Sequence, residues 1–355
     1  MKNVLNKVFA TIFIFLLSSV ITYGYSDEWI EKVVVDKEFE INKNANLLID
    51  HEFGNVRMEN WDKDVISIVV TIRVETSSDE KAAEIINNVI VDVKGDRKKV
   101  EAVCELNQKY RNKKNVKVMI DFDIKMPKSI SLDLDHSFGS VNIETVSGPT
   151  SISSEYGNIE IVSLDNAQNQ IELSFGNGDI KYITNGEIEV GYSKISIDGA
   201  DELSLEAEYS DVRIGKIKSL SFEIDGGNAE IEYVENLDVE SSMTNIEIGE
   251  LSGSLNCESD YGSVTIDYIS KEFSNIAIAN SFGAVNMNID KNASYKFEAD
   301  GHYCKVNYEE DNANISYRNS SATSNVIKGV LGKDSNPNSS VIISSEYGAV
   351  NIGSK

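Results

Sequence analysis

The sequence predicts an all-β fold, a parallel β-solenoid with two short strands in each coil of about 17–21 residues. Three observations predict it: a short motif recurs at near-constant spacing, apolar and polar residues alternate within each copy, and proline is scarce. The motif reads aromatic, Gly, any residue, Val or Ile, any residue, Ile or Met, as in Phe138 to Ile143. The chain has 3 prolines, which suits a continuous ladder of strands, because proline cannot donate a ladder hydrogen bond.

The spacing of the motif is the first observation. From Phe138 to Tyr209 its aromatic residue recurs every 17–19 residues, and degenerate copies follow around Gly226 and Met243. A period this regular is typical of repeats that each cover the hydrophobic face of a neighbour. The aromatic residues of the motif are Phe53, Phe138, Tyr156, Phe175, Tyr192, Tyr209, Tyr261, Phe282, Tyr303 and Tyr347.

Alternation within one copy shows how each repeat folds. Leu203 to Tyr209 alternates apolar and polar residues, and Val212 to Ile214 alternates again after a break. A period of two indicates a half-buried strand. Each repeat therefore holds two strands and two turns, and equivalent strands are expected to pair in parallel, about 4.8 Å apart.

The aromatic residues share the parity of Leu203, Leu205 and Ala207, so we expect them to face inward as a packing ladder along one corner. If the rings faced outward, they could instead form a sugar-binding platform. The glycines that follow them are expected to supply a positive φ at the corner. These corner glycines are Gly54, Gly139, Gly157, Gly176, Gly262, Gly283 and Gly348.

Three segments are predicted along the chain. Residues 1–24 have a basic start, an apolar stretch and small residues near the end, which indicates a signal peptide. Residues 25–130 form a β-rich section with one helix, over 80–88, that packs on or caps the first coil. Residues 131–355 form the solenoid, including one degenerate coil around 315–326. The protein is therefore expected to be exported: periplasmic, on the cell surface or secreted.

Composition argues against several classes of binding partner and site. The formal net charge of −25 disfavours nucleic acid and anionic membranes, which bind through Lys and Arg. The 3 cysteines, Cys104, Cys257 and Cys304, are odd in number and widely spaced, so neither a disulfide framework nor a zinc site is predicted. No second stretch is apolar enough for a membrane span, and no cofactor motif occurs.

The motif, the Trp61–Val65 turn and the export signal together resemble the "putative adhesin" or GIN head-domain family of exported bacterial β-strand-repeat proteins. This resemblance implies a β-solenoid in the cell envelope, and its name suggests adhesion. It supplies no catalytic residue.

Three candidate sites remain. His51 and His136 lie two residues before a motif aromatic and His302 lies one before, so they could be metal ligands, an acid–base pair, or residues of a semi-buried corner position. Asp179 lies in a glycine-rich stretch similar to calcium-binding turns. Outward carboxylate pairs, such as Glu206 with Glu208 and Glu230 with Glu232, have the composition of a glycosidase site.

The function expected from the sequence is a non-catalytic exported scaffold, adhesin-like, with a protein or glycan partner in the envelope and no cofactor. Two alternatives stay open: a carbohydrate-active β-helix enzyme, which is a polysaccharide hydrolase or lyase, and a calcium-stabilised adhesin. The partner and the oligomeric state are not specified by the sequence.

Overall fold

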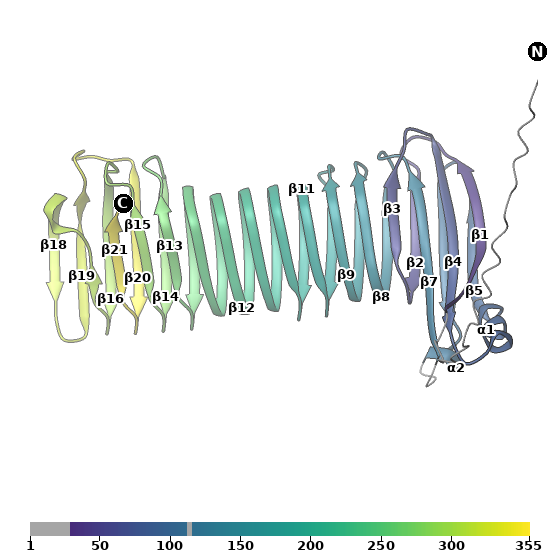
Figure 1. The fold of residues 1–355 in the computed structure, drawn as a ribbon. Helices are drawn as coiled ribbons and strands as arrows, with labels where there is room; N and C mark the ends of the chain where they lie inside the picture. The colour runs from purple at the N-terminus through teal and green to yellow at the C-terminus, as the bar shows by residue number, and fades with distance from the viewer. Residues whose placement is uncertain (1–28, 112–115) are drawn as a thin grey trace, which may run out of the picture.

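The computed structural model describes residues 29–111 and 116–355, so the predicted signal peptide lies outside the described residues. Strands dominate the described part, which confirms the all-β prediction. Figure 1 shows them side by side in an elongated stack, with the helices at the N-terminal end.

The middle of the stack consists of parallel strands whose equivalent residues lie next to one another. Thr150 of β9 is paired with Leu132 of β8 and with Asn169 of β10, and Glu187 of β11 is paired with Gln170. Buried Ile, Leu and Val side chains alternate with exposed polar ones along each strand, as predicted. The strands are β8 (Ser131–Val146), β9 (Thr150–Leu164), β10 (Asn169–Ser174), β11 (Asn177–Gly191) and β12 (Lys194–Asp260), the last a 67-residue run across several repeats.

The N-terminal end shows that the sheet is mixed rather than wholly parallel. β1 and β7 both flank β4 in antiparallel pairs, and β5 is antiparallel to β6. β2 and β3 pair in parallel with β8 on one side and with β6 and β7 on the other. The strands are β1 (Trp29–Glu40), β2 (Asn46–Glu52), β3 (Val56–Asn60), β4 (Val65–Glu75), β5 (Val89–Gly95), β6 (Lys99–Leu106) and β7 (Lys117–Met126).

A helix forms close to the range predicted for it. Helix α1 (Asp79–Ile86) begins after Ser78, whose hydroxyl accepts a hydrogen bond from the backbone N–H of Lys81, as an N-cap does. A short second helix, α2 (Gln108–Arg111), follows β6. In the structure the predicted N-terminal section therefore combines antiparallel strands and helices with strands that continue the parallel pairing of β8.

The C-terminal end departs from chain order. The last long strand, β20, lies between β14 and β16, and β21 lies between β15 and β17. The degenerate coil predicted around 315–326 is wrong: β18 and β19 form an antiparallel hairpin against β16. The elements are β13 (Val264–Ile269), β14 (Asn275–Ser281), β15 (Val285–Ile289), β16 (Tyr295–His302), β17 (Val306–Asn307), η1 (Glu310–Asn312), β18 (Ala313–Ser320), β19 (Ser324–Leu331), β20 (Ser339–Glu346) and β21 (Val350–Ser354).

Candidate binding faces along an exposed aromatic ladder

The motif aromatics lie on the surface, so the prediction that they face inward is wrong. Their exposed fractions run from 45% at Phe138 to 62% at Tyr261, and Phe53 is half-buried. The cause is the backbone: the predicted ladder residues have φ between 46° and 62°, the left-handed region. In one repeat this conformation breaks the alternation, because the buried residues are odd-numbered from Leu203 to Ala207 and even-numbered from Ser210 to Ile214.

The glycines after the rings have a different role from the one predicted. A positive φ occurs at Gly54 and Gly139, with 154° and 159°, but the other five predicted corner glycines are not among the positive-φ residues. They are needed because adjacent repeats approach closely. A Cβ on Gly283 would lie 1.6 Å from the carbonyl oxygen of Gly262, and one on Gly348 would lie 1.6 Å from that of Gly283.

The rings stack face to face, and we call this row the aromatic ladder. Neighbouring centroids are 4.8–5.3 Å apart with interplanar angles of 2–25°. Tyr347 stacks between Phe282 and Tyr303, which follows from the position of β20. Because each ring covers the face of the next, the ladder presents mainly ring edges and tyrosine hydroxyls to solvent.

The aromatic ladder is interrupted at one place, which we call the gap. Gly226 and Met243 occupy the two positions between Tyr209 and Tyr261, and no ring pair among the described residues spans them. Tyr209 tilts by 25° from Tyr192, and its Cδ1 lies 2.9 Å from where a Cβ of Gly226 would be. At the gap, therefore, the ring faces of Tyr209 and Tyr261 are not covered by another ring.

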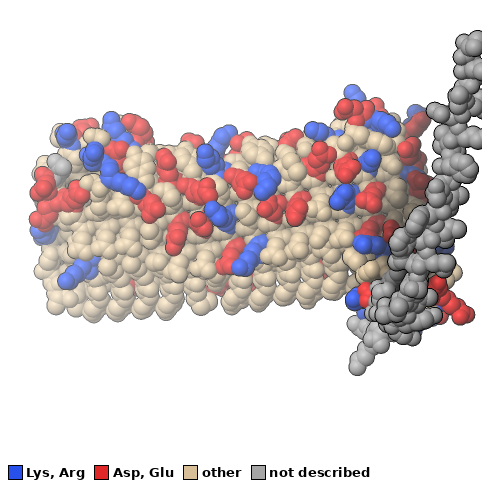
Figure 2. Space-filling view, viewed as in Figure 1, with Lys and Arg blue, Asp and Glu red and all other residues tan. Residues whose placement is uncertain are grey.

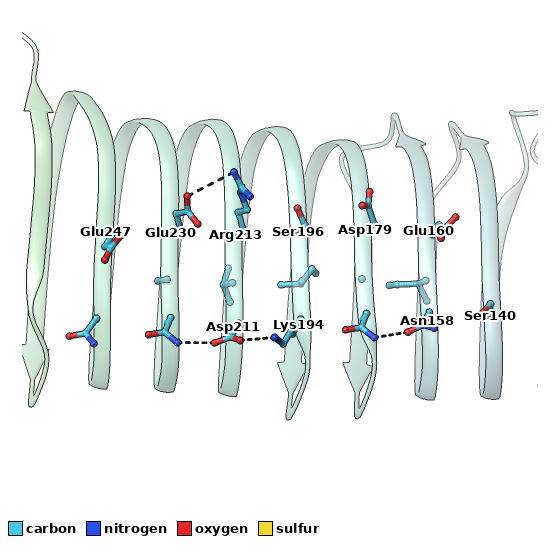
Figure 3. A pocket seen from close by; sticks show the side chains of 18 residues that line it. Ser140, Asn158, Glu160, Asp179, Lys194, Ser196, Asp211, Arg213, Glu230 and Glu247 are labelled. Carbon is cyan, nitrogen blue, oxygen red and sulfur yellow. Dashed lines mark hydrogen bonds and ion pairs between the residues drawn. The ribbon is translucent and has the colours of Figure 1, made fainter.

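The strands that follow the ladder residues form a face with charges of both signs, the mixed face. It carries a hollow of about 800 Å³, seen from close by in Figure 3. Lys194 pairs with Asp211 at 3.3 Å, and Arg213 pairs with Glu232 at 3.0 Å. Figure 2 likewise shows basic and acidic side chains interspersed over the middle strands.

The strands that precede the ladder residues form a second face, the acidic face. Between residues 150 and 260 these strands contain no Lys or Arg, and their outward positions are rich in carboxylates. The strand register places Glu189 beside both Glu172 and Glu206. The exposed acids of this face are Glu155, Glu172, Glu187, Glu189, Glu206, Glu208, Glu223, Asp225, Asp238, Glu240, Glu258 and Asp260.

His51 and His136 meet beneath the ladder. The two Nδ1 atoms are 2.9 Å apart, and Nε2 of His51 is 2.6 Å from the carbonyl oxygen of Ile120. A carbonyl only accepts, so His51 carries its proton on Nε2 and its Nδ1 accepts from His136. Burial lowers the pKa of both imidazoles, that of His136 to about 4. The pair is therefore neutral and buried, which fits the predicted corner position better than a site open to substrate.

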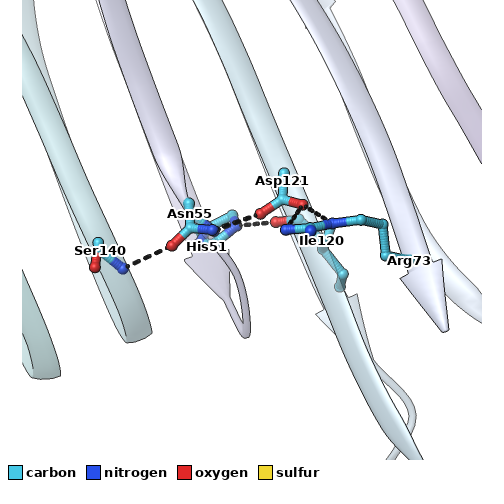
Figure 4. Close-up of polar contacts among 6 residues, drawn as sticks. All are labelled: His51, Asn55, Arg73, Ile120, Asp121 and Ser140. Carbon is cyan, nitrogen blue, oxygen red and sulfur yellow. Dashed lines mark hydrogen bonds and ion pairs between the residues drawn. The ribbon is translucent and has the colours of Figure 1, made fainter. Parts of the chain in front are cut away.

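A polar network lies over this pair. Asp121 accepts from Arg73 and from the side chain and backbone of Asn55, and Asn55 accepts from the backbone of Ser140. Figure 4 shows these residues in a row across adjacent strands. Arg73, Asp121 and Ser140 belong to β4, β7 and β8, and Asn55 directly precedes β3, so the network ties neighbouring strands together.

The other sequence-predicted candidates do not converge. His302 is exposed and lies 3.5 Å from Asp300, far along the chain from the buried pair. Asp179 pairs with Lys181 at 2.8 Å, and the described residues contain no group of three or more His, Cys, Asp or Glu side chains that could hold a metal ion. Both Glu230 and Glu232 face Arg213, at 3.9 and 3.0 Å.

Sequence reasoning missed the acidic face as a continuous surface. The signal was present, because a Glu stands three residues before the ladder position in consecutive repeats from Glu172 to Glu240.

Within the described residues, no helix has the length and apolar character of a membrane span.

Comparisons with known proteins return solved structures only. No protein-family model matches, and no curated protein matches. A putative cell adhesion protein from Clostridium sporogenes is 12% identical, with 92% of this chain and 100% of that chain covered and a TM-score of 0.21. A putative adhesin from Parabacteroides merdae is 9% identical, with 72% and 92% covered and a TM-score of 0.32. A putative adhesin from Parabacteroides distasonis is 12% identical, with 74% and 93% covered and a TM-score of 0.30.

Proposed function

We propose that the protein is a non-catalytic, exported β-solenoid scaffold that binds a protein or glycan partner in the cell envelope, as an adhesin does. The observation that carries this proposal is the aromatic ladder, a stripe of about half-exposed rings that runs along one edge of the stack on both sides of the gap. Contiguous exposed apolar surface on a soluble protein marks an interaction site.

Energetics supports a surface role for the rings. A left-handed backbone costs about 1–2 kcal/mol at a residue other than glycine, and one stacked ring pair contributes about 0.5–1.5 kcal/mol. The two effects nearly cancel, so Gly or Asn would make the same turn at least as well. The rings therefore add little to the stability of the fold, and their exposed edges are better explained by contact with a partner.

A ladder variant tests the proposal. Asn tolerates the left-handed conformation, so the triple substitution of Tyr156, Tyr192 and Tyr209 by Asn should keep the fold and remove the stripe. The matched control replaces Val162 and Tyr182, which are exposed outside the ladder, by Asn. We expect binding to a glycan array and to washed bacterial envelopes to fall in the ladder variant and persist in the control. Equal binding by both variants would contradict the proposal.

The two alternatives are separated by further assays. Incubation with neutral and acidic polysaccharides should release neither reducing ends nor unsaturated products from a scaffold, whereas turnover would favour the enzyme. Thermal melts with calcium and with a chelator should coincide, because the carboxylate of Asp179 is already paired with Lys181. A rise in melting temperature with calcium would favour the calcium-stabilised adhesin.

A further inference from the structure

We propose that the acidic face, centred on the gap in the aromatic ladder, binds an extended Lys- and Arg-rich segment of a partner protein. The proposal rests on the proposed scaffold function and names the chemical class of one partner. It follows from three features that lie side by side: uncompensated charge, a hollow walled by carboxylates of successive repeats, and ring faces that no other ring covers.

The charge of the acidic face is uncompensated within the chain. No carboxylate of this face takes part in any ion pair found in residues 29–111 and 116–355, whereas acids of the mixed face pair with Lys181, Lys194 and Arg213. Like charges on adjacent strands are unfavourable. A surface that keeps such repulsion over successive repeats is complementary to a cation from outside the chain.

A hollow of about 560 Å³ lies on the acidic face beside the gap. Its wall includes Glu223, Glu240 and Glu258 from successive repeats. Ser259, which also lines it, is a buried residue between exposed Glu258 and Asp260, so the outward groups of this strand in the hollow are carboxylates. Carboxylates are acceptors, and the ammonium and guanidinium groups of a ligand consist of donors.

The gap adds aromatic surface next to this hollow. Tyr261 is the most exposed ladder residue, at 62%, and Met243 beside it is 54% exposed. Their repeats also supply Glu240 and Glu258 to the hollow. A guanidinium group can stack on a tyrosine face while it pairs with a carboxylate, so this position favours arginine.

The spread of the carboxylates favours a polypeptide over a metal ion. Six stacked repeats, from Glu172 to Glu258, span about 24 Å at about 4.8 Å per strand. An extended peptide of about seven residues covers the same length. By contrast, the described residues offer no cluster of three or more metal-binding side chains, so a single cation would meet too few ligands.

Binding of dye-labelled hepta-arginine, followed by fluorescence anisotropy at low salt, tests the inference. The variant replaces Glu223, Glu240 and Glu258 by Gln. The matched control replaces Glu160, Glu230 and Glu247, which are exposed on the mixed face, by Gln, so that both proteins change by the same net charge. We expect affinity to fall roughly tenfold in the acidic-face variant and less than about twofold in the control.

Three outcomes would overturn the inference: no binding of hepta-arginine, equal losses in both variants, or tighter binding of spermine or a cationic chitosan oligomer than of the peptide. Coincident thermal melts of the two variants establish that both are folded. If ladder-dependent binding to envelopes persists while hepta-arginine fails to bind, this inference falls and the scaffold function stands. If envelope binding is independent of the ladder while hepta-arginine binds the acidic face, the proposal that the ladder binds the partner falls and this inference stands.

Discussion

Replacement of Gly283 by Ala tests how closely the repeats are packed. The added Cβ would lie 1.6 Å from the carbonyl oxygen of Gly262, against about 3.3 Å for an ordinary close C···O contact. The two repeats must therefore separate locally. Two backbone hydrogen bonds hold them there, from Tyr261 to Ser281 and from Val264 to Ala284, each 2.9 Å. Losing both, at about 1 kcal/mol each, and the Tyr261–Phe282 stack, at about 1 kcal/mol, destabilises the fold by about 3 kcal/mol.

Urea denaturation followed by circular dichroism measures this free energy of unfolding. Gly191→Ala is the matched control, because a Cβ there would meet its nearest atom, Oγ of Ser174, at an ordinary 3.6 Å. We expect the control to change stability by less than about 0.5 kcal/mol. Equal stability of Gly283→Ala and the control would refute the reasoning that close approach selects these glycines.

Three further predictions concern stability and reactivity. Folding lowers the pKa of both His51 and His136, so protonation of the unfolded chain destabilises the fold as the pH falls below about 6.5. For His136, whose pKa is lowered to about 4, the free energy of unfolding should drop by about 2 kcal/mol between pH 7.5 and pH 5, and the double substitution by Leu should flatten this slope. Tyr209→Ala should cost about 1–2 kcal/mol rather than the 3–5 kcal/mol of a buried ring, since the ring is 50% exposed; a loss above 3 kcal/mol in urea denaturation would place the ring inside. Burial raises the pKa of the Cys104 and Cys257 thiols to about 12, so neither should react with Ellman's reagent at pH 8 until the protein unfolds, and rapid modification in the native state would contradict their burial.

The sequence predicts the class of fold because its strongest signals are local. Alternation such as that from Leu203 to Tyr209 needs only one strand and one buried face, and the period of the motif needs only that repeats stack. The helix at Asp79–Ile86 was likewise predictable, because Ser78 and the acidic first turn are local start signals.

Three features could not be predicted by the same reasoning. The outward rings depend on the φ of one residue per repeat, and parity counting assumes that no such residue interrupts the strand. The position of Tyr347 between Phe282 and Tyr303 depends on a strand that returns out of chain order. The antiparallel pairs at both ends depend on which long-range partner each strand meets, and period-two alternation does not distinguish parallel from antiparallel neighbours.

The candidate sites, like the fold, were predictable only in part. His51 and His136 share an offset from the ladder, and that offset brought them to attention as a pair; the structure joins them but buries them. The acidic face could not be recognised without the strand register. Only the register shows that its carboxylates lie beside other carboxylates rather than beside a basic side chain.

Nitration of the native protein with tetranitromethane, followed by peptide mapping, tests most directly the claim that the aromatic ladder is a surface. The ladder tyrosines, Tyr156, Tyr192, Tyr209, Tyr261, Tyr303 and Tyr347, are each exposed by 47% or more, whereas Tyr295 is 6% exposed. We expect the ladder tyrosines to be modified rapidly and Tyr295 to be modified only after unfolding. Protection of the ladder tyrosines to the same degree as Tyr295 would contradict the account, because the rings would then belong to the core.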